Sequence, residues 1–550
     1  MLRVLRRLKL REIILFIFLF IFASFLMLKT FSVKEGNILI ASRAWSDFAA
    51  TLPLIRSFSL GSNFPPQYPI FAGPPIRYHF IFFTIVGLLE KIGVRIDWAL
   101  NTLSVISFFL LCSAIYYLGK IIFKSGKVGF LSVILFLFNG SFGFLEFFKK
   151  NPLSVNTPIT ILQNTEFSSF GPYDGKIVSA FWSLNIFTNQ RHLALAYAAF
   201  LFLVLLVYLF SKYPHELTWK KTVAIGLVLG LFPFIHLAAF AMMGIAILTF
   251  FLIYPEFRTK LFVLGLIALA LAIPQYLYMG SSSTETQLLN PGYLVKNRTL
   301  QGYLIYWFMN LGITIILAFI GLILANKSQR KIFLPFLALF IAGNLFQFSP
   351  EAAANHKFFN LFAIGVNFFT AFFLVKVWNK QALEKIIAIL LLLPLTLTGI
   401  IDFFPVVNDR YIELSDYPTN PTIRFIVQNT PKDSVFLNSQ FLYDSASLAG
   451  RKIFMGWPYF PWATGYNTNA RFRIMKTILE GSDKETTCRR LLREHIDYVE
   501  TQEPTSFEDI TTNYLLFEEN FDNVFTNKQA KINIYNIKTS CSKLDLKTPY

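Results

Sequence analysis

Residues 13–31 read IILFIFLFIFASFLMLKTF, an apolar run whose only charged member is Lys29. An α-helix rises about 1.5 Å per residue, so about 20 apolar residues cross the hydrocarbon core of a bilayer. The run is too long for the apolar part of a signal peptide, and no small-residue cleavage site follows it. It is therefore predicted to be an uncleaved first membrane span.

Ten further runs have the same character: 98–119, 128–147, 192–211, 222–236, 237–254, 261–278, 303–325, 332–348, 358–376 and 384–403. A twelfth candidate, 78–92, is shorter and contains His79, Glu90 and Lys91, so we expect it to lie along the membrane surface. The fifth and sixth spans meet at Phe234–His236 and are expected to form a tight hairpin. These patterns predict about 11 transmembrane helices.

The composition agrees with that reading. Of the 550 residues, 54% are hydrophobic and only 15% are charged, and the mean hydropathy is +0.51. A soluble chain of this size carries far more charge on its surface. A cytosolic enzyme, a disordered protein and a secreted disulfide scaffold are therefore excluded, and a polytopic α-helical membrane protein is predicted.

The distribution of charge divides the chain near residue 404. Residues 1–403 hold 33 Lys and Arg against 14 Asp and Glu, whereas residues 404–550 hold 17 against 18. The first part is predicted to be the transmembrane domain and the second a soluble domain of ordinary size. Because the basic residues lie between apolar runs, they indicate membrane orientation and no nucleic-acid partner.

Lys and Arg beside a span resist translocation, so they mark the cytoplasmic side. With eleven spans, 19 of the 33 basic residues fall on one side together with the N-terminus. The protein is therefore predicted to sit in the cell membrane with its N-terminus cytoplasmic and its C-terminal domain extracytoplasmic. The long outer loops are then 32–97, 148–191, 279–302 and 349–357, and long polar loops are where sites are built.

Three motifs in the outer loops carry a family resemblance. They are Ser46-Asp47 through Arg77-Tyr78-His79 in the first loop, Asn189-Gln190-Arg191-His192-Leu193, and Asn355-His356-Lys357-Phe358-Phe359-Asn360. An acid soon after the first span, a short helix, a Gly/Pro/Tyr turn and a surface helix resemble the first loop of GT-C glycosyltransferases. The chain is most similar to uncharacterised bacterial members of that superfamily, whose enzymes use lipid-phosphate-linked sugars.

The resemblance maps the first-loop catalytic acid of the superfamily onto Asp47. A sugar acceptor hydroxyl must lose a proton as it attacks the anomeric carbon, and a positioned carboxylate can accept that proton. Asp47 is therefore predicted to be the general base. The alternative is that it caps a helix beginning near Phe48, a role that Asp fills well.

Glu166 and Asp174 are the candidates for a second catalytic acid, in the next outer loop. The clean paired-acid pattern of many superfamily members is absent, so dependence on a divalent metal, Mg or Mn, is left open and no metal ligand is assigned. Turn chemistry explains Asp174 equally well, because it stands in Pro172-Tyr173-Asp174-Gly175.

Cations at the outer interface are expected to bind the donor phosphate: Arg191, Arg298 and Lys357, together with the neighbouring His192. Arg presents a planar fork that suits phosphate. The alternative is that each basic side chain extends toward lipid headgroups.

Four further polar residues of the motifs are predicted to bind substrate: Arg77, His79, Asn355 and His356. Asn355 has a simpler alternative, which is to satisfy backbone groups near the start of a span. His236, at the hairpin tip, is interpreted as a satisfied interfacial residue.

The tail is predicted to be a small α/β domain that packs against the membrane body. Helices are expected at 421–429, 468–480 and 485–495, strands at 434–438, 453–455 and 496–500, and a hairpin at 523–526 and 531–537. The aromatic segment around Trp457 is a candidate to cover the membrane site. Cys488 and Cys541 could pair if the domain faces an oxidising compartment.

The predicted function is transfer of a sugar from a polyprenyl-phosphate donor to a glycan, lipid or protein acceptor on the extracytoplasmic face. One alternative is a secondary transporter or lipid-linked glycan flippase, and another is a relative that binds a glycolipid without catalysis. The outer loops hold most of the acids, and transporters place ionisable groups near the midplane, which favours the enzyme.

Overall fold

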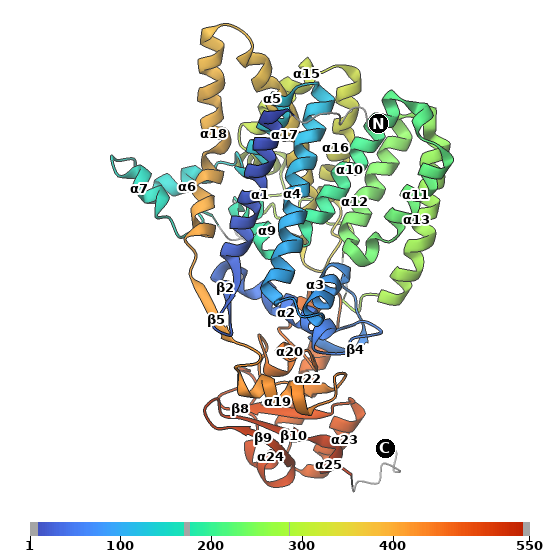
Figure 1. Ribbon diagram of the computed structural model, residues 1–550, viewed down its shortest axis with the longest axis vertical. Coiled ribbons are helices and arrows are strands. Elements are labelled where there is room, and N and C mark those ends of the chain that lie inside the picture. Colours follow the sequence, from blue (N-terminus) through green and yellow to red (C-terminus); the bar gives the residue numbers. More distant parts are fainter. Residues whose placement is uncertain (1–8, 170–176, 285–286, 506, 543–550) are drawn as a thin grey trace.

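The computed structural model describes residues 9–169, 177–284, 287–505 and 507–542. Figure 1 shows a bundle of long helices at one end of the molecule and a smaller domain built around a sheet at the other. The chain passes from the bundle to the smaller domain through helix α18 (Ala382–Val407) and strand β5 (Tyr411–Ser415). α18 thus ends three residues beyond the predicted boundary at 404.

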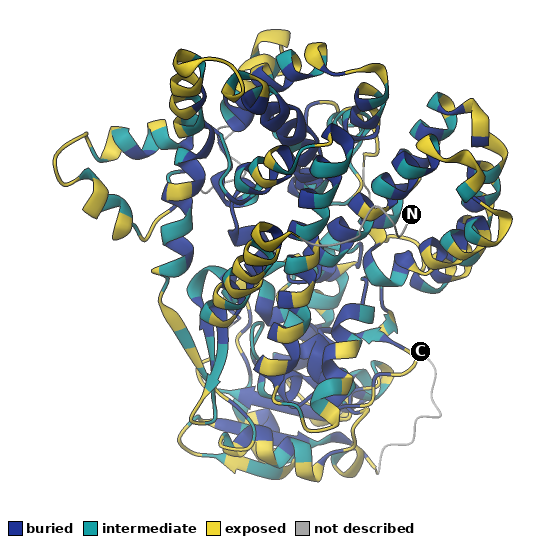
Figure 2. Cartoon of the chain, turned by 45° about the horizontal axis from the view of Figure 1, so that its top comes forward, coloured by how far each residue is buried: buried dark blue, intermediate teal, exposed yellow. Residues whose placement is uncertain are grey.

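Seven helices in the described ranges are long and apolar enough to cross a membrane: α1 (Leu10–Thr30), α4 (Ile96–Phe123), α10 (Leu193–Lys212), α12 (Phe232–Ile253), α13 (Arg258–Met279), α17 (His356–Trp378) and α18. α10 and α17 are the most buried of the seven, and α1 and α13 are the most exposed. Figure 2 shows exposed residues along the outer faces of the bundle. On α13 these include Phe262, Leu266 and Leu269, as expected of a face that contacts lipid.

The predicted span 303–325 is broken. It consists of α14 (Leu300–Leu311) and α15 (Thr314–Leu324), which are bent by 89° and make an eighth span only if they are counted together. Gly312 forms the break with φ +62°, and a Cβ there would lie 1.8 Å from the carbonyl oxygen of Gly140. Apolar residues continue on both sides of this glycine, so the hydropathy pattern did not reveal the bend.

Three other predicted spans are helical but fall outside the seven: α5 (Gly126–Leu137), α11 (Trp219–Gly230) and α16 (Lys327–Leu345). α5 and α11 have 12 residues each, so each helix is shorter than the hydrocarbon core of a bilayer is thick. α16 begins with a polar first turn. The predicted run 128–147 ends at Leu137 because a turn at Asn139–Gly140 precedes the separate helix α6 (Gly143–Lys150). By length and composition the described residues therefore give seven or eight candidate spans, and the predicted count of about 11 stays a prediction.

The helix ends that were predicted to be cytoplasmic contact one another. Lys212 at the end of α10 donates to Ser328 in α16 (2.7 Å), and Lys331 donates to the carbonyl of Ile253 at the end of α12 (3.0 Å). Figure 1 places this end of the bundle away from the sheet domain. These helix ends therefore lie together, and the assignment of the basic end to the cytoplasm stays a prediction.

The first loop folds onto the start of the tail. It contains β1 (Phe31–Lys34), β2 (Asn37–Ala41), α2 (Trp45–Ser59), β3 (Gln67–Tyr68), β4 (Phe71–Pro75) and α3 (Ile81–Lys91). The β1–β2 hairpin pairs with β5, with Asn37 opposite Ser415. α3 has 11 residues, so it is too short to cross a bilayer, and it packs on α2.

In the described residues between α5 and α10, the chain forms four short helices: α6, α7 (Thr157–Leu162), α8 (Ser179–Trp182) and α9 (Asn185–Asn189). α7 extends sideways from the bundle in Figure 1. α9 leads through a tight turn into α10, which brings the Asn189–Leu193 motif to the tail-facing end of the bundle.

The tail is an α/β domain, as predicted. Its sheet has the order β7-β6-β8-β10-β9, with β6 parallel to both neighbours and β10 antiparallel to both of its own. The strands are β6 (Val435–Leu437), β7 (Lys452–Ile453), β8 (Tyr498–Gln502), β9 (Asp522–Asn527) and β10 (Ile532–Asn536). The helices are α19 (Pro421–Asn429), α20 (Ser445–Leu448), α21 (Tyr459–Ala463), α22 (Thr468–Leu479), α23 (Lys484–Arg493), α24 (Tyr514–Asn520) and α25 (Ile537–Ser540). A disulfide joins Cys488 to Cys541.

The first loop and the tail share one apolar core. Phe48 and Ile55 of α2 belong to the same buried cluster as Phe436 of β6 and Ile478 of α22. The long helices form a second cluster around α10 and α17. The first loop is therefore held between the bundle and the tail, and both bodies can contribute to a site built on it.

The tail contains a buried pair of carboxyl groups that gives a stability prediction. Burial, the charge of Asp444 and a hydrogen bond shared with Asp444 raise the pKa of Glu500 well above its usual range. The folded state thus favours protonated Glu500, so its contribution is present at low pH and is lost as the pH rises through the folded pKa.

We expect Glu500→Gln to stabilise the protein at about pH 8 by about 1–3 kcal/mol, because it removes a second buried charge beside Asp444, and to have little effect near pH 5. Thermal unfolding at the two pH values measures the difference. The exposed Glu519→Gln should show no such pH dependence. An equal change at both pH values for Glu500→Gln would contradict the prediction.

Candidate active site

Helix α2 presents Asp47 from its first turn. The helix begins at Trp45 after a turn at Ser42–Ala44, and buried Phe48 and Leu52 anchor its inner face. The Asp47 side chain makes no capping hydrogen bond and no ion pair with any residue that the structure describes. The capping alternative, which placed the start of the helix near Phe48, is therefore wrong, and the half-buried carboxylate is free to act on a ligand.

Asp47 lines a cavity of about 100 Å³. Polar neighbours in the lining are Tyr68, Tyr78, Asn189, Gln190, His192 and Thr464. These residues come from the first loop, from the turn before α10 and from the segment of α21 in the tail. Two of the three motifs singled out in the sequence thus meet in one cavity, and the aromatic segment of the tail covers it, as expected.

The surroundings of Asp47 tune its chemistry. Burial raises the pKa of Asp47 to about 6, and the positive charge of Lys357 opposes that rise. When the pKa of a general base lies near the working pH, a large fraction of the base is ionised and it still accepts a proton effectively. Burial also raises the pKa of Tyr68 and Tyr78, so both present neutral hydroxyls that can donate hydrogen bonds.

Lys357 is the predicted cation that lies within electrostatic range of Asp47. It stands in the first turn of α17, and its ammonium group has no hydrogen bond or ion pair in the described part of the chain. A half-buried ammonium without a partner is available for an anionic ligand. The motif Asn355–Asn360 therefore contributes to this region through Lys357.

Arg191 has a different role from the predicted phosphate contact. Its side chain is 1% exposed, and it donates to the carbonyl of Thr188 (2.7 Å), to Asn101 (2.9 Å), to Thr30 (2.8 Å) and to the carbonyl of Met27 (3.2 Å). Four of its five N–H groups are thus already hydrogen-bonded. The guanidinium therefore has no pair of free N–H groups for a bidentate contact with phosphate. Arg191 joins α1, α4 and the turn before α10, and it does not extend toward lipid headgroups.

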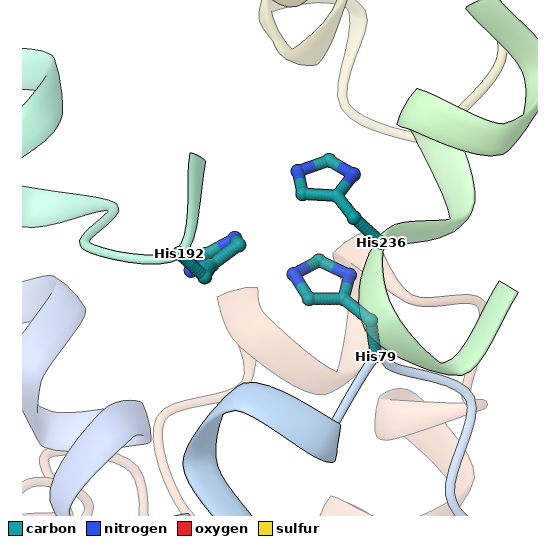
Figure 3. Close-up of side chains that lie close together, drawn as sticks. All are labelled: His79, His192 and His236. Carbon is teal, nitrogen blue, oxygen red and sulfur yellow. The ribbon is translucent and has the colours of Figure 1, made fainter. Parts of the chain in front are cut away.

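Three histidines from separate segments lie against one another (Figure 3). His79 precedes α3, His192 precedes α10, and His236 stands at a break inside α12. The ring centroids of His79 lie 4.4 Å from those of both His192 and His236. Burial lowers the pKa of His79 and His192 well below the usual range, so both rings are neutral at physiological pH.

His236 was interpreted from the sequence as a satisfied interfacial residue, and that interpretation holds for only one of its nitrogens. Nδ1 accepts a hydrogen bond from the backbone N–H of Ala239 (3.1 Å), whereas buried Nε2 has no partner. The sequence signal that could have found it is the polar residue inside an otherwise apolar run.

The remaining predicted substrate residues hold the framework together. Asn355 donates to the carbonyls of Gly343 (3.0 Å) and Phe346 (2.6 Å), which is the simpler alternative noted from the sequence. His356 is buried, and its Nδ1 lies 2.9 Å from Oδ1 of Asn360.

Arg77 links the first loop to the tail. Its guanidinium donates to Ser283 (3.1 Å) and to the carbonyl of Gly465 (2.5 Å), and it stacks over the ring of Tyr466. Arg298 lies outside the cavity of Asp47, where it is exposed and donates to Asn290 (3.0 Å).

The predicted second acids do not join Asp47 in the described residues. Glu166 is exposed and lines a different cavity, of about 440 Å³, with Lys150 and Asn164. Asp174 lies outside the described residues. The cavity lining offers one carboxylate, that of Asp47, and Mg²⁺ prefers oxygen ligands that include carboxylates. A role for Mg or Mn therefore stays a prediction.

No family model matches the sequence, and no curated protein matches it. Solved structures match its fold. The arabinofuranosyltransferase AftD from Mycobacteria aligns over 96% of this chain and 42% of its own, with a TM-score of 0.59 and 10% identity. ArnT from Cupriavidus metallidurans aligns over 96% of this chain and 97% of its own, with a TM-score of 0.50 and 11% identity.

The oligosaccharyltransferase from Archaeoglobus fulgidus in its apo form aligns over 97% of this chain and 75% of its own, with a TM-score of 0.45 and 13% identity. AftD and ArnT are glycosyltransferases of the GT-C type. The chain is thus a multi-pass membrane protein with the GT-C fold, as the first-loop resemblance implied.

Proposed function

We propose that the protein is a membrane glycosyltransferase that moves a sugar from a polyprenyl-phosphate donor to an acceptor hydroxyl on the extracytoplasmic face. The observation that carries this proposal is the carboxylate of Asp47, which has no partner in the described part of the chain, lines a cavity between bundle and tail and lies within the electrostatic range of Lys357. A GT-C fold provides the setting but does not by itself define an activity.

In the proposed reaction, Asp47 accepts the proton of the acceptor hydroxyl. The acceptor oxygen forms a bond to the anomeric carbon of the sugar, and the bond from that carbon to the phosphate oxygen breaks. The bonding electrons leave with the lipid phosphate, whose negative charge Lys357 stabilises. Tyr68 and Tyr78 are placed to orient hydroxyl groups through their neutral O–H groups.

An apolar groove lined by the residue that follows His79 supports a lipid-linked donor. It has a volume of about 800 Å³ and is lined by Phe58, Phe80 and Phe234, with Lys91 and Lys432 among its polar members. Phe80 directly follows His79, and its N–H bonds to the carbonyl of Phe234 (2.9 Å). The groove therefore adjoins the polar residues of the site, as an isoprenoid chain would require. ArnT from Cupriavidus metallidurans has also been solved bound to undecaprenyl phosphate.

The extracytoplasmic orientation rests on two observations. Basic helix ends gather at the end of the bundle away from the tail, as the positive-inside pattern requires. The Cys488–Cys541 disulfide is typical of domains in oxidising compartments. Both observations favour an extracytoplasmic location for the tail. The cavity of Asp47, which the tail helps to line, would then also lie outside the cytoplasm.

The function is tested with purified protein in lipid vesicles and polyprenyl-phosphate sugars that carry a labelled sugar. We expect acceptor-dependent release of the lipid phosphate and transfer of the label. Passage of intact donor across the vesicle membrane without release of lipid phosphate would indicate the transporter alternative and would overturn the proposal. Binding of donor without release would indicate the non-catalytic alternative.

The pKa of Asp47 gives a pH prediction. The ionised carboxylate is the active base, and its pKa is about 6, so the ionised fraction rises with pH through that value. We expect kcat/KM to rise about tenfold between pH 5 and pH 7 and then to level off. Initial rates across this range measure the profile, and a rate that falls or stays constant from pH 5 to pH 7 would contradict the assignment of Asp47 as the base.

A further inference from the structure

We propose that His79, His192 and His236 form a binding site for a transition-metal ion. Each of the three offers one ring nitrogen, and these nitrogens lie within 4.8 Å of one another. Figure 3 shows the rings of His79 and His236 side by side, each with one nitrogen directed toward His192. The inference goes beyond the proposed function, because metal binding is measured without any transfer reaction.

The spacing is close to that of a loaded site. Zn–N bonds are about 2.0–2.1 Å long, so two nitrogens on a tetrahedral ion lie about 3.4 Å apart. The three nitrogens need to approach one another by no more than the difference between that spacing and 4.8 Å. Rotation of the imidazole rings about their side-chain torsions is the movement that the proposal requires.

The cluster leaves its polar atoms unsatisfied without a ligand. The side chains of His79, His192 and His236 are 7%, 4% and 1% exposed, and four of their nitrogens have no hydrogen-bond partner within the ranges that the structure describes. Leaving a buried polar group unpaired costs about 1–3 kcal/mol. The three histidines come from distant parts of the sequence and face one another. One metal ion that binds all three would explain why these buried rings lie together.

The donor set indicates the class of metal. All three ligands are imidazoles, which suit Zn²⁺, Cu²⁺, Ni²⁺ and Fe²⁺, whereas Mg²⁺ and Mn²⁺ prefer oxygen. Three protein ligands leave one tetrahedral position open. His192 also lines the cavity of Asp47, so the open position is available to water or to a phosphate oxygen from that side.

His236 is expected to be the weakest of the three ligands. Its Nδ1 accepts a hydrogen bond from Ala239, so the proton of the neutral ring resides on Nε2, the nitrogen that faces His192. Binding a metal there moves the proton to Nδ1 and breaks the hydrogen bond to Ala239. Nε2 of His79 and both nitrogens of His192 have no hydrogen bond to lose.

The test uses the full-length protein in detergent, stripped of metal with a chelator and then dialysed against Zn²⁺. Elemental analysis should find about one tightly bound Zn²⁺ per chain, and excess Mg²⁺ should not displace it. We expect His79→Gln and His192→Gln to lower the affinity at least tenfold and His236→Gln to lower it less. His356→Gln is the matched control, because His356 is equally buried but lies outside the cluster, and it should keep the ion.

A second measurement does not depend on the folding of variants. X-ray absorption of the Zn²⁺-loaded wild-type protein should show imidazole nitrogens as the main ligands. A wild-type chain that retains no Zn²⁺, a His192→Gln variant that retains as much as wild type, or an absorption spectrum with oxygen ligands alone would each overturn the proposal. None of these results depends on whether the protein transfers a sugar.

Discussion

Replacing Asp47 by Asn is expected to lower the rate of sugar transfer by about a hundred- to ten-thousand-fold, the usual contribution of a general base. Asn has the same shape as Asp but cannot accept the acceptor proton. Because Asp47 makes no hydrogen bond or ion pair with the described residues, its replacement breaks no contact of the fold. The loss should therefore appear in kcat, with expression and thermal stability unchanged.

The matched control is Glu35→Gln, which removes an exposed carboxylate from the same outer loop and should leave the rate unchanged. Rates are compared as release of lipid phosphate from a saturating donor. Equal turnover by Asp47→Asn and wild type would remove Asp47 from the mechanism. If Glu35→Gln lowered the rate as much as Asp47→Asn does, the effect would come from the total charge of the loop and not from Asp47 itself.

Replacing Arg56 by Met is expected to destabilise the protein by about 3–5 kcal/mol, because it leaves buried acids without their cation. Arg56 of α2 is 3% exposed. It pairs with Asp416 at the start of the tail (2.5 Å) and with Glu90 at the end of α3 (3.3 Å). The loss should separate the first loop from the tail, and thermal or denaturant unfolding of the detergent-solubilised protein measures it.

A double variant separates charge from packing. Arg56→Met combined with Asp416→Asn should recover part of the loss, because one of the stranded carboxylates is removed with the cation. Arg473→Met is the matched control, since Arg473 is exposed and should tolerate the change. If Arg56→Met unfolds at the same temperature as Arg473→Met, the ion pairs do not hold the two parts together.

Local signals in the sequence predicted their elements well. Helix α19 was predicted at 421–429 and begins and ends there, because Asn420 caps it and Pro421 suits its first turn. The bend at Gly312 was not predicted, because the residues on both sides are apolar and hydropathy carries no information about backbone direction. The same limit explains why one apolar run, 303–325, corresponds to two helices.

The candidate site was predicted in part. Asp47 and Lys357 were chosen from motifs, and the structure places both where one charge acts on the other. Arg191 was chosen for the same reason, but its N–H groups donate to Thr30, Asn101 and Met27, which are all distant in the sequence. A motif identifies a side chain, whereas its partners decide whether that side chain is free.

The amino-acid sequence by itself determined that the chain is a polytopic membrane protein with an α/β tail, and it predicted that the chemistry lies in the outer loops. Run length, charge asymmetry and turn residues are properties of neighbouring positions, so they can be read without a structure. Only the tertiary structure decided that His236 meets His79 and His192, and that Asp47 has no hydrogen-bond or ion-pair partner among the described residues. Those contacts join segments far apart in the chain, and their free energies depend on how all the helices pack together.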